Sequence, residues 1–127
     1  MSSEWIRLEL AKYSELTELE PHGVCVQGRD LILIRHGDQV AVLSGRCPHR
    51  GARLAEAKID GDLLVCGSHG WDFHYRDGTS PSNPEDNLRQ FSARIDLDAD
   101  VVWIDEADFE RWAETYQEVF DPDELMI

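Results

Sequence analysis

Two short boxes in the middle of the chain, each holding one cysteine and one histidine near a glycine, constrain the fold more than any other feature. They read Cys47-Pro48-His49-Arg50-Gly51 and Cys66-Gly67-Ser68-His69-Gly70. Such a pattern is typical of a metal site built from two loops, because thiolate and imidazole groups are common ligands of transition metals. The fold must therefore bring these two segments together.

The spacing within the boxes separates two kinds of metal site. Structural zinc accepts two cysteines and two histidines, but zinc-finger spacing pairs Cys with Cys and His with His. Here both boxes are mixed, and a single residue separates Cys47 from His49. That gap suits a [2Fe–2S] centre in which two thiolates hold one iron and two imidazoles hold the other. The candidate ligands are Cys47, His49, Cys66 and His69, and zinc in the same positions is the alternative.

Length and composition predict one globular domain over residues 1–127. The chain has 127 residues, of which 42% are hydrophobic, and this suits a single modest core. Its longest clearly apolar run, residues 31–34, is far shorter than the roughly 20 residues that a membrane span requires. The first residues do not resemble a signal peptide. We therefore expect a cytoplasmic protein that makes no membrane contact.

The charge excludes one class of partner. With 26 acidic and 12 basic residues the net charge is −14, so we expect no binding to nucleic acid, which requires a basic face. Two explanations for the acidity stay open. An acidic surface can steer a carrier toward a basic redox partner. It can also belong to a protein from a salty cytoplasm, where screening weakens that steering.

Short strand patterns separated by turn signals predict an all-β fold, a small antiparallel sandwich or barrel. The expected strands are residues 5–10, 24–27, 30–35, 39–43, 62–65, 91–97 and 101–104. We expect the third cysteine, Cys25, to be a small buried strand residue. Residues 44–73 should form an insertion that carries both boxes, with a helical turn within 54–59. A C-terminal α-helix is expected over about 105–120, capped by Asp105 and packed on the sheet by Phe109 and Trp112.

The boxes and the strands around them resemble the Rieske family of [2Fe–2S] proteins, from about Trp5 to Ile104. The resemblance implies the Rieske fold, in which a cluster-binding subdomain is inserted into a small antiparallel domain. It also implies that Cys47 and Cys66 ligate an inner iron, and that His49 and His69 ligate an outer iron near the surface. The C-terminal helix lies outside the family core.

Four positions indicate a branch of this family. Respiratory and photosynthetic members carry an extra cysteine in each box, where this chain has Ala52 and Ser68. Those members also place hydroxyl donors at the positions of Trp71 and Phe73. Fewer donors leave more negative charge on the cluster, so we expect a reduction potential at the low end of the range, about −150 mV.

The chain further resembles the soluble Rieske ferredoxins of oxygenase systems, including the loop 78–86. That resemblance implies an electron carrier rather than an enzyme, with a flavin reductase and an oxygenase as protein partners and no small-molecule substrate. The alternative is a Rieske subunit of another redox enzyme, such as the small subunit of a nitrite reductase. We expect His22, His36 and His74 to be ordinary surface or satisfied histidines, although His74 is close in sequence to the second box.

Overall fold

The computed structural model of this chain describes residues 6–47, 53–66, 71–81 and 87–115. Most of its regular structure is β. The strands are β1 Arg7–Ala11, β2 His22–Val26, β3 Arg29–His36, β4 Gln39–Ser44, β5 Lys58–Asp60, β6 Leu63–Val65, β7 Asp72–His74, β8 Gln90–Phe91, β9 Ala93–Asp96 and β10 Val101–Asp105. The helices are two short 3₁₀ turns, η1 Tyr13–Glu15 and η2 Leu54–Glu56, and one α-helix, α1 Glu106–Thr115.

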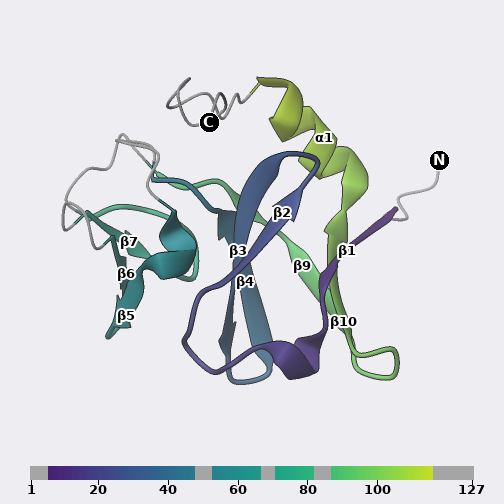
Figure 1. Cartoon of the computed structure of the whole chain (residues 1–127), viewed down its shortest axis with the longest axis horizontal. Coiled ribbons are helices and arrows are strands. Elements are labelled where there is room, and N and C mark those ends of the chain that lie inside the picture. The colour runs from purple at the N-terminus through teal and green to yellow at the C-terminus, as the bar shows by residue number, and fades with distance from the viewer. Residues whose placement is uncertain (1–5, 48–52, 67–70, 82–86, 116–127) are drawn as a thin grey trace, which may run out of the picture.

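The strands form three antiparallel sheets (Figure 1). The first sheet has the order β1-β10-β9, the central sheet β2-β3-β4-β8, and the third sheet β5-β6-β7. Strands β4 and β8 are neighbours in the central sheet, although the whole third sheet lies between them in the sequence. The third sheet is therefore an insertion into the β domain. In the sequence, β5 and β6 lie between the two boxes, and β7 follows the second box.

The central sheet is buried on both faces. Strand β3 alternates its side chains between two apolar clusters, with Leu31 and Leu33 on one side and Ile32 and Ile34 on the other, and all four are at most 1% exposed. Side chains alternate across a strand, so a continuous apolar run in β3 is what a strand covered on both faces requires.

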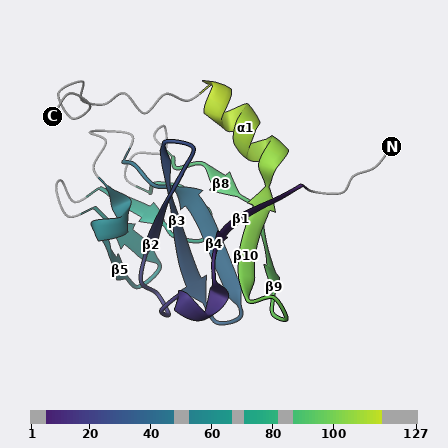
Figure 2. The same ribbon diagram turned by 45° about the vertical axis from the view of Figure 1, so that its right-hand side comes forward.

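Each face of the central sheet packs against a different partner (Figure 2). The box-side core joins Ile32, Ile34 and Leu43 of the central sheet to Leu64 and Phe73 of the third sheet, and it includes Cys47 and Cys66. The helix-side core lies on the other face. It joins Leu31, Leu33, Val42 and Phe91 to Val102 and Ile104 of the first sheet and to Phe109, Trp112 and Ala113 of α1.

Helix α1 begins where β10 ends, and Asp105 caps it. The backbone N–H of Ala107 donates to Oδ1 of Asp105 at 3.3 Å, as an N-cap residue allows. The side chains of Phe109 and Trp112 are buried against Phe91, with ring centroids 6.2 Å and 5.3 Å from it. The predicted aromatic stripe is therefore confirmed over this part of the helix, whereas the predicted continuation to about residue 120 lies outside the described residues.

The predicted fold class is confirmed, and most predicted strands lie within one or two residues of the observed ones. The predicted helical turn within 54–59 is confirmed as the 3₁₀ turn η2, which the short strand β5 follows. Two local predictions need correction. The strand expected over 91–97 is divided at Ser92 into β8 and β9, which belong to different sheets. Cys25 is exposed, because β2 is an edge strand and Val24 and Val26 take its inner face. No helix in the described ranges is long and apolar enough to cross a membrane.

Candidate metal centre

The two cysteines of the boxes lie in one apolar cluster. Cys47 is 0% exposed and Cys66 is 2% exposed, and both belong to the box-side core. Neither forms a disulfide. The fold thus brings together the first residue of each box, as the sequence requires.

The first box begins at a closely packed junction with β3. The N–H of Gly45 donates to the carbonyl of Asp30 at 2.8 Å, and a Cβ atom at position 45 would lie only 2.8 Å from the backbone carbon of Asp30. One residue later, Nε of Arg46 donates to Oδ2 of Asp30 at 2.8 Å, and both side chains are largely buried. Beyond the box, Leu54 N–H donates to the carbonyl of Gly45 at 2.9 Å. These contacts fix the backbone on both sides of residues 47–52.

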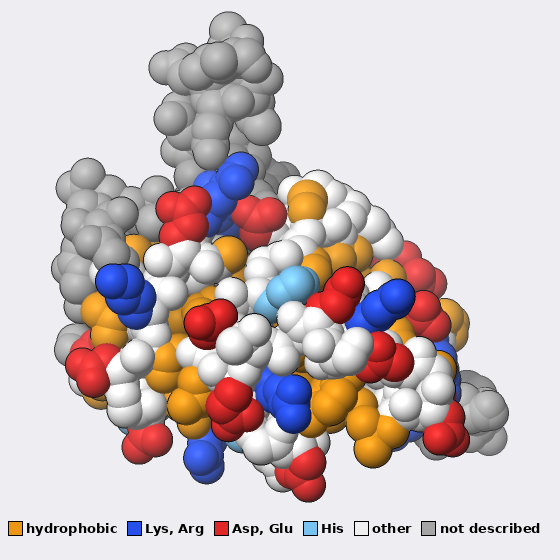
Figure 3. Space-filling model, turned by 60° about the horizontal axis from the view of Figure 1, so that its bottom comes forward, with side chains coloured by type: hydrophobic (Ala, Val, Ile, Leu, Met, Phe, Trp, Pro, Cys, Tyr) orange, Lys and Arg blue, Asp and Glu red, His pale blue; other side chains and the backbone are white. Residues whose placement is uncertain are grey.

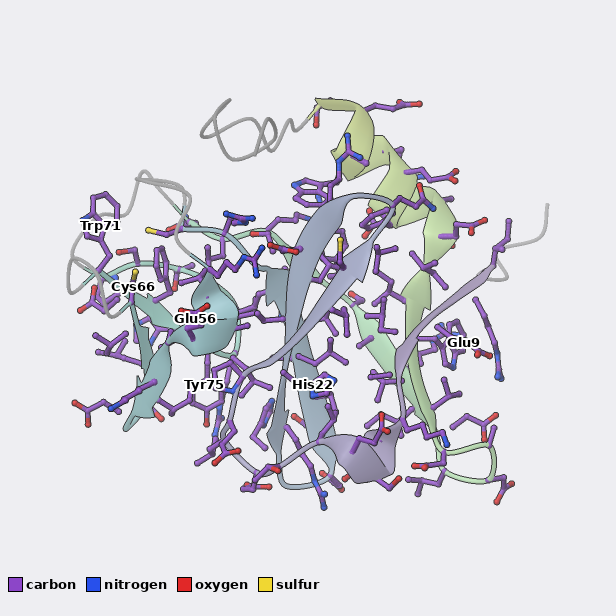
Figure 4. All side chains as sticks on the ribbon, in the orientation of Figure 1. Glu9, His22, Glu56, Cys66, Trp71 and Tyr75 are labelled. Carbon is purple, nitrogen blue, oxygen red and sulfur yellow. The ribbon has the colours of Figure 1, made fainter. Side chains whose placement is uncertain are left out.

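The second box begins at the end of the β6–β7 ladder. Val65 pairs with Asp72, and the N–H of Cys66 then donates to the carbonyl of Trp71 at 2.8 Å. Figure 4 shows the Trp71 side chain projecting from this end of the third sheet, with Cys66 below it. The hydrogen bond closes the chain across residues 67–70, so the second box is also held at its base.

The remaining ligand candidates, His49 and His69, lie outside the described residues, as do Ala52 and Ser68. Within the described ranges, no group of three or more His, Cys, Asp or Glu side chains is arranged to hold a metal ion. The further ligands of a metal site at the two cysteines therefore belong to residues outside these ranges.

The surroundings of the two cysteines fit a metal–thiolate site. An isolated thiolate is unfavourable in an apolar core, and coordination to a cation removes much of that cost. Two cysteine thiols outside any disulfide, buried in one cluster and each at the fixed base of a histidine-containing box, are the donor set that one iron of a [2Fe–2S] cluster requires.

Two other histidines, His36 and His74, lie in different parts of the fold. His36, at the end of β3, packs edge-on against Tyr75 with ring centroids 5.5 Å apart. Partial burial and the nearby Arg76 guanidinium both lower the pKa of His36. His74 pairs with Leu63, at the opposite end of the β6–β7 ladder from Cys66, so it is farther from the cysteines than its sequence position indicated.

Sequence reasoning did not find the residues that support the boxes. Asp30 and the carbonyl of Trp71 hold the segments next to Cys47 and Cys66. One signal was available, because Arg46 is a basic residue directly before a cysteine in a chain with net charge −14.

Known proteins share this architecture. The chain superposes on the Sphingomonas yanoikuyae B1 ferredoxin with a TM-score of 0.71 and 23% identity, covering 80% of this chain and 99% of that one. A chain of the complex of reduced oxygenase and oxidized ferredoxin in carbazole 1,9a-dioxygenase gives a TM-score of 0.66 at 27% identity, covering 76% and 99%. At 23% identity, the likeness to the Sphingomonas yanoikuyae B1 ferredoxin shows a shared fold.

Sequence relatives are longer. The oxygenase component of 3-ketosteroid-9-alpha-monooxygenase from Mycobacterium tuberculosis is 39% identical over 69 residues, which are 53% of this chain and 17% of that protein. The chain spans less than a quarter of the length of the curated relatives that it matches. The family model for the Rieske [2Fe–2S] domain matches residues 6–92, which include both boxes, the whole central and third sheets, and β1 of the first sheet. The chain therefore belongs to the Rieske [2Fe–2S] domain family, whose domain binds a [2Fe–2S] cluster.

Proposed function

We propose that Cys47, His49, Cys66 and His69 hold the [2Fe–2S] cluster of this chain and that the protein carries single electrons. The observation that carries this proposal is the burial of Cys47 and Cys66, neither of them in a disulfide, in one apolar cluster. The two histidines follow these cysteines within the boxes, at positions 49 and 69. When bound, a cluster with this ligand set supplies one-electron transfer at a higher potential than a cluster held by four cysteines.

The protein's own residues set the conditions for that chemistry. The apolar core around Cys47 and Cys66 excludes water from the thiolate side, and the contacts at Gly45, Arg46 and Trp71 hold the two boxes in place. A rigid, dry site changes little when its charge changes, which favours rapid electron transfer. We propose that electrons leave through the histidine side, since an imidazole edge near the surface gives a partner the shortest path.

We propose a flavin reductase as the electron donor and an oxygenase as the acceptor, both in the cytoplasm. Two comparisons support the oxygenase as the acceptor. One similar structure is a complex of a reduced oxygenase and an oxidized ferredoxin, and this chain covers 99% of the matched chain of that complex. A curated relative is the oxygenase component of a monooxygenase. In this proposal the chain is a carrier component and not the catalyst.

Cluster content tests the ligand assignment. Protein purified without oxygen should contain two irons and two sulfides per chain and give the visible and EPR spectra of a mixed Cys/His cluster. C47S and C66S should lose these spectra, and H69C should give a cluster with three cysteine ligands and one histidine ligand and a lower potential. C25S is the matched control, because Cys25 is exposed on β2. A colourless protein with one zinc per chain would refute the cluster.

Electron transfer tests the role. The holoprotein should be reduced reversibly by one electron and should accept electrons rapidly from an NADH-dependent flavin reductase. It should then reoxidise faster when a Rieske oxygenase and its substrate are added than with either alone. Copurification in a stable stoichiometric complex with a nitrite-reducing subunit would contradict the proposal of a discrete oxygenase carrier.

A further inference from the structure

A hollow of about 260 Å³ lies beside the first box. Its wall includes Gly23, Cys25, Asp30, Gly45, Arg53 and Ala55. These residues come from the edge strand β2, from β3 and from the segments on both sides of residues 47–52. A partner segment in this hollow would therefore touch the base of the loop that carries Cys47 and His49.

Glycine at position 23 lets one wall of the hollow come close to β2. A Cβ atom at position 23 would lie 2.7 Å from Cβ of Ala55, so only glycine at that position lets η2 approach β2 this closely. Cys25 follows on the same face of β2, where it is exposed, and it pairs across the ladder with Asp30. This face of β2 thus contacts η2 at Gly23 and lines the hollow at Cys25.

Arg53 is the notable charge in this wall. Other arginines of the described ranges have partners for their side chains: five lie within 4.0 Å of a carboxylate, Arg76 and Arg94 lie over aromatic rings, and Arg29 donates to the carbonyl of Ala113. Among these described arginines, the Arg53 side chain alone makes no hydrogen bond, ion pair or ring contact.

An uncompensated guanidinium is unusual in a chain with net charge −14. On the face seen in Figure 3, acidic and basic side chains are interspersed, with no single-sign patch. Arg53 is exposed and shares the wall of the hollow with Val24, Ile32 and Ala55, so an anion that pairs with it there is partly shielded from water. A planar guanidinium in such a place matches a carboxylate, which it can bind through two parallel hydrogen bonds.

We propose that the hollow receives an acidic segment of the protein that exchanges electrons with this chain, with a carboxylate of that segment paired to Arg53. This inference rests on the proposed carrier function. The volume accommodates one or two side chains, so the contact is small, as befits a carrier that must bind and leave at each turnover. The position of the hollow next to both described ends of the first box places the partner beside the segment that carries Cys47.

Cys25 offers a direct reporter for this test, because it lines the hollow and is the exposed cysteine of the three. The rate of its alkylation by iodoacetamide is measured on the holoprotein by mass spectrometry, with and without an N-acetylated hexaglutamate amide. The peptide should slow alkylation at least threefold, and an uncharged hexaglutamine peptide should not. R53Q should abolish the protection, and R53K should retain part of it.

R111Q is the matched control, since Arg111 is an exposed arginine on α1, away from the hollow. It should show full protection. Equal protection in R53Q and in the unaltered chain, or none in the unaltered chain, overturns the proposal. If deleting residues 116–127 by itself produces a threefold faster alkylation, the hollow is occupied by the chain's own C-terminal segment, which also overturns it.

The visible spectrum of every sample separates this inference from the proposed function. A full cluster spectrum with an unprotected Cys25 overturns the docking site alone. A sample with no cluster overturns the carrier function and, with it, the partner assigned to the hollow.

Discussion

Nε of Arg46 donates a 2.8 Å hydrogen bond to Oδ2 of Asp30, and this ion pair joins β3 to the residue directly before Cys47. Its side chains are 13% and 25% exposed, against 47% and 29% for the pair Arg7–Asp96. Removing a partner from a largely buried, charge-assisted hydrogen bond costs more than removing one from an exposed pair.

D30N should therefore lower the free energy of unfolding by about 1–2 kcal/mol and should speed the loss of visible absorbance when a chelator is added. R7Q, which breaks the exposed pair, should change stability by less than about 0.5 kcal/mol and leave cluster loss unchanged. Denaturant titration and the decay of the absorbance measure the two effects. Equal effects of D30N and R7Q would show that the Arg46–Asp30 pair does not support the first box.

Gly78 holds the end of the third sheet to the segment that leads into β8. Its φ is +82°, and an added Cβ would lie 2.7 Å from the carbonyl oxygen of Leu88. G78A should destabilise the protein by about 2–3 kcal/mol, because it combines a left-handed backbone with a clash against backbone. G61A has a φ of +62° but no atom near its Cβ, so it should cost only about 1 kcal/mol. Thermal melts of the two variants test this difference, and a G61A protein as unstable as G78A would contradict it.

The carboxylate of Asp77, next to Gly78, should make the stability of the protein depend on pH. The N–H and the hydroxyl of Thr79 both donate to Oδ1 of Asp77, at 3.0 Å and 2.8 Å, and these bonds lower the pKa of Asp77 below its ordinary 3.8. A lowered pKa means that the folded state favours the charged carboxylate. The stabilisation is present above the unfolded pKa and is lost as the pH falls through the folded one.

Replacing Asp77 by asparagine keeps an acceptor and removes the titration. We expect D77N to flatten the decline of stability below about pH 4 and to change stability at pH 7 by less than about 1 kcal/mol, since this turn is exposed. Denaturant midpoints measured between pH 2.5 and 7 provide the comparison. An unchanged acid profile in D77N would mean that Asp77 does not contribute to it.

The helix-side core can be weakened without touching the metal centre. Phe109 is 0% exposed, and its ring lies 5.7 Å from that of Trp112. F109A should cost about 3–4 kcal/mol, as expected for a truncated buried aromatic, whereas E110A on the exposed face of α1 should cost less than about 0.5 kcal/mol. Under native conditions the visible spectrum and potential of F109A should equal those of the unaltered protein, because the central sheet separates the two cores. A shifted potential would show that the cores are coupled.

Phe73 allows a test of the expected potential. It is 0% exposed in the same core as Cys47 and Cys66, and hydrogen-bond donors near cluster sulfurs raise the reduction potential. The unaltered protein should titrate near −150 mV, at the low end of the family range, and F73Y should titrate higher. F73L, which adds no hydroxyl, is the control for altered packing. A titration of the unaltered protein above zero would sink the donor argument.

The strands and the types of ligand could be predicted from the sequence, because both have local signals. The apolar run in β3 and the turn glycines at positions 28, 37 and 61 mark the strands locally, because alternation and positive φ are properties of short segments. The boxes likewise identify the ligand types. Cys25 could have been predicted to be exposed from its place between Val24 and Val26, once those valines were taken as the inner face.

Contacts between residues far apart in the sequence could not be predicted from the sequence alone. The Arg46–Asp30 contact depends on how β3 sits against the start of the first box, and the division at Ser92 depends on two sheets sharing one continuous segment. Neither has a local signal. The positions of His49 and His69 stay a prediction.

The double burial of β3 also determines which sequence changes this protein can accept. Because Ile32 and Ile34 face the boxes while Leu31 and Leu33 face α1, inserting a single residue into this strand would exchange the two sets and mismatch both cores at once. The β5–β6 turn at Gly61 lies outside this strand, and an added Cβ there meets no atom within 4 Å. We expect related chains to vary in length at this turn and to keep the length of β3 constant.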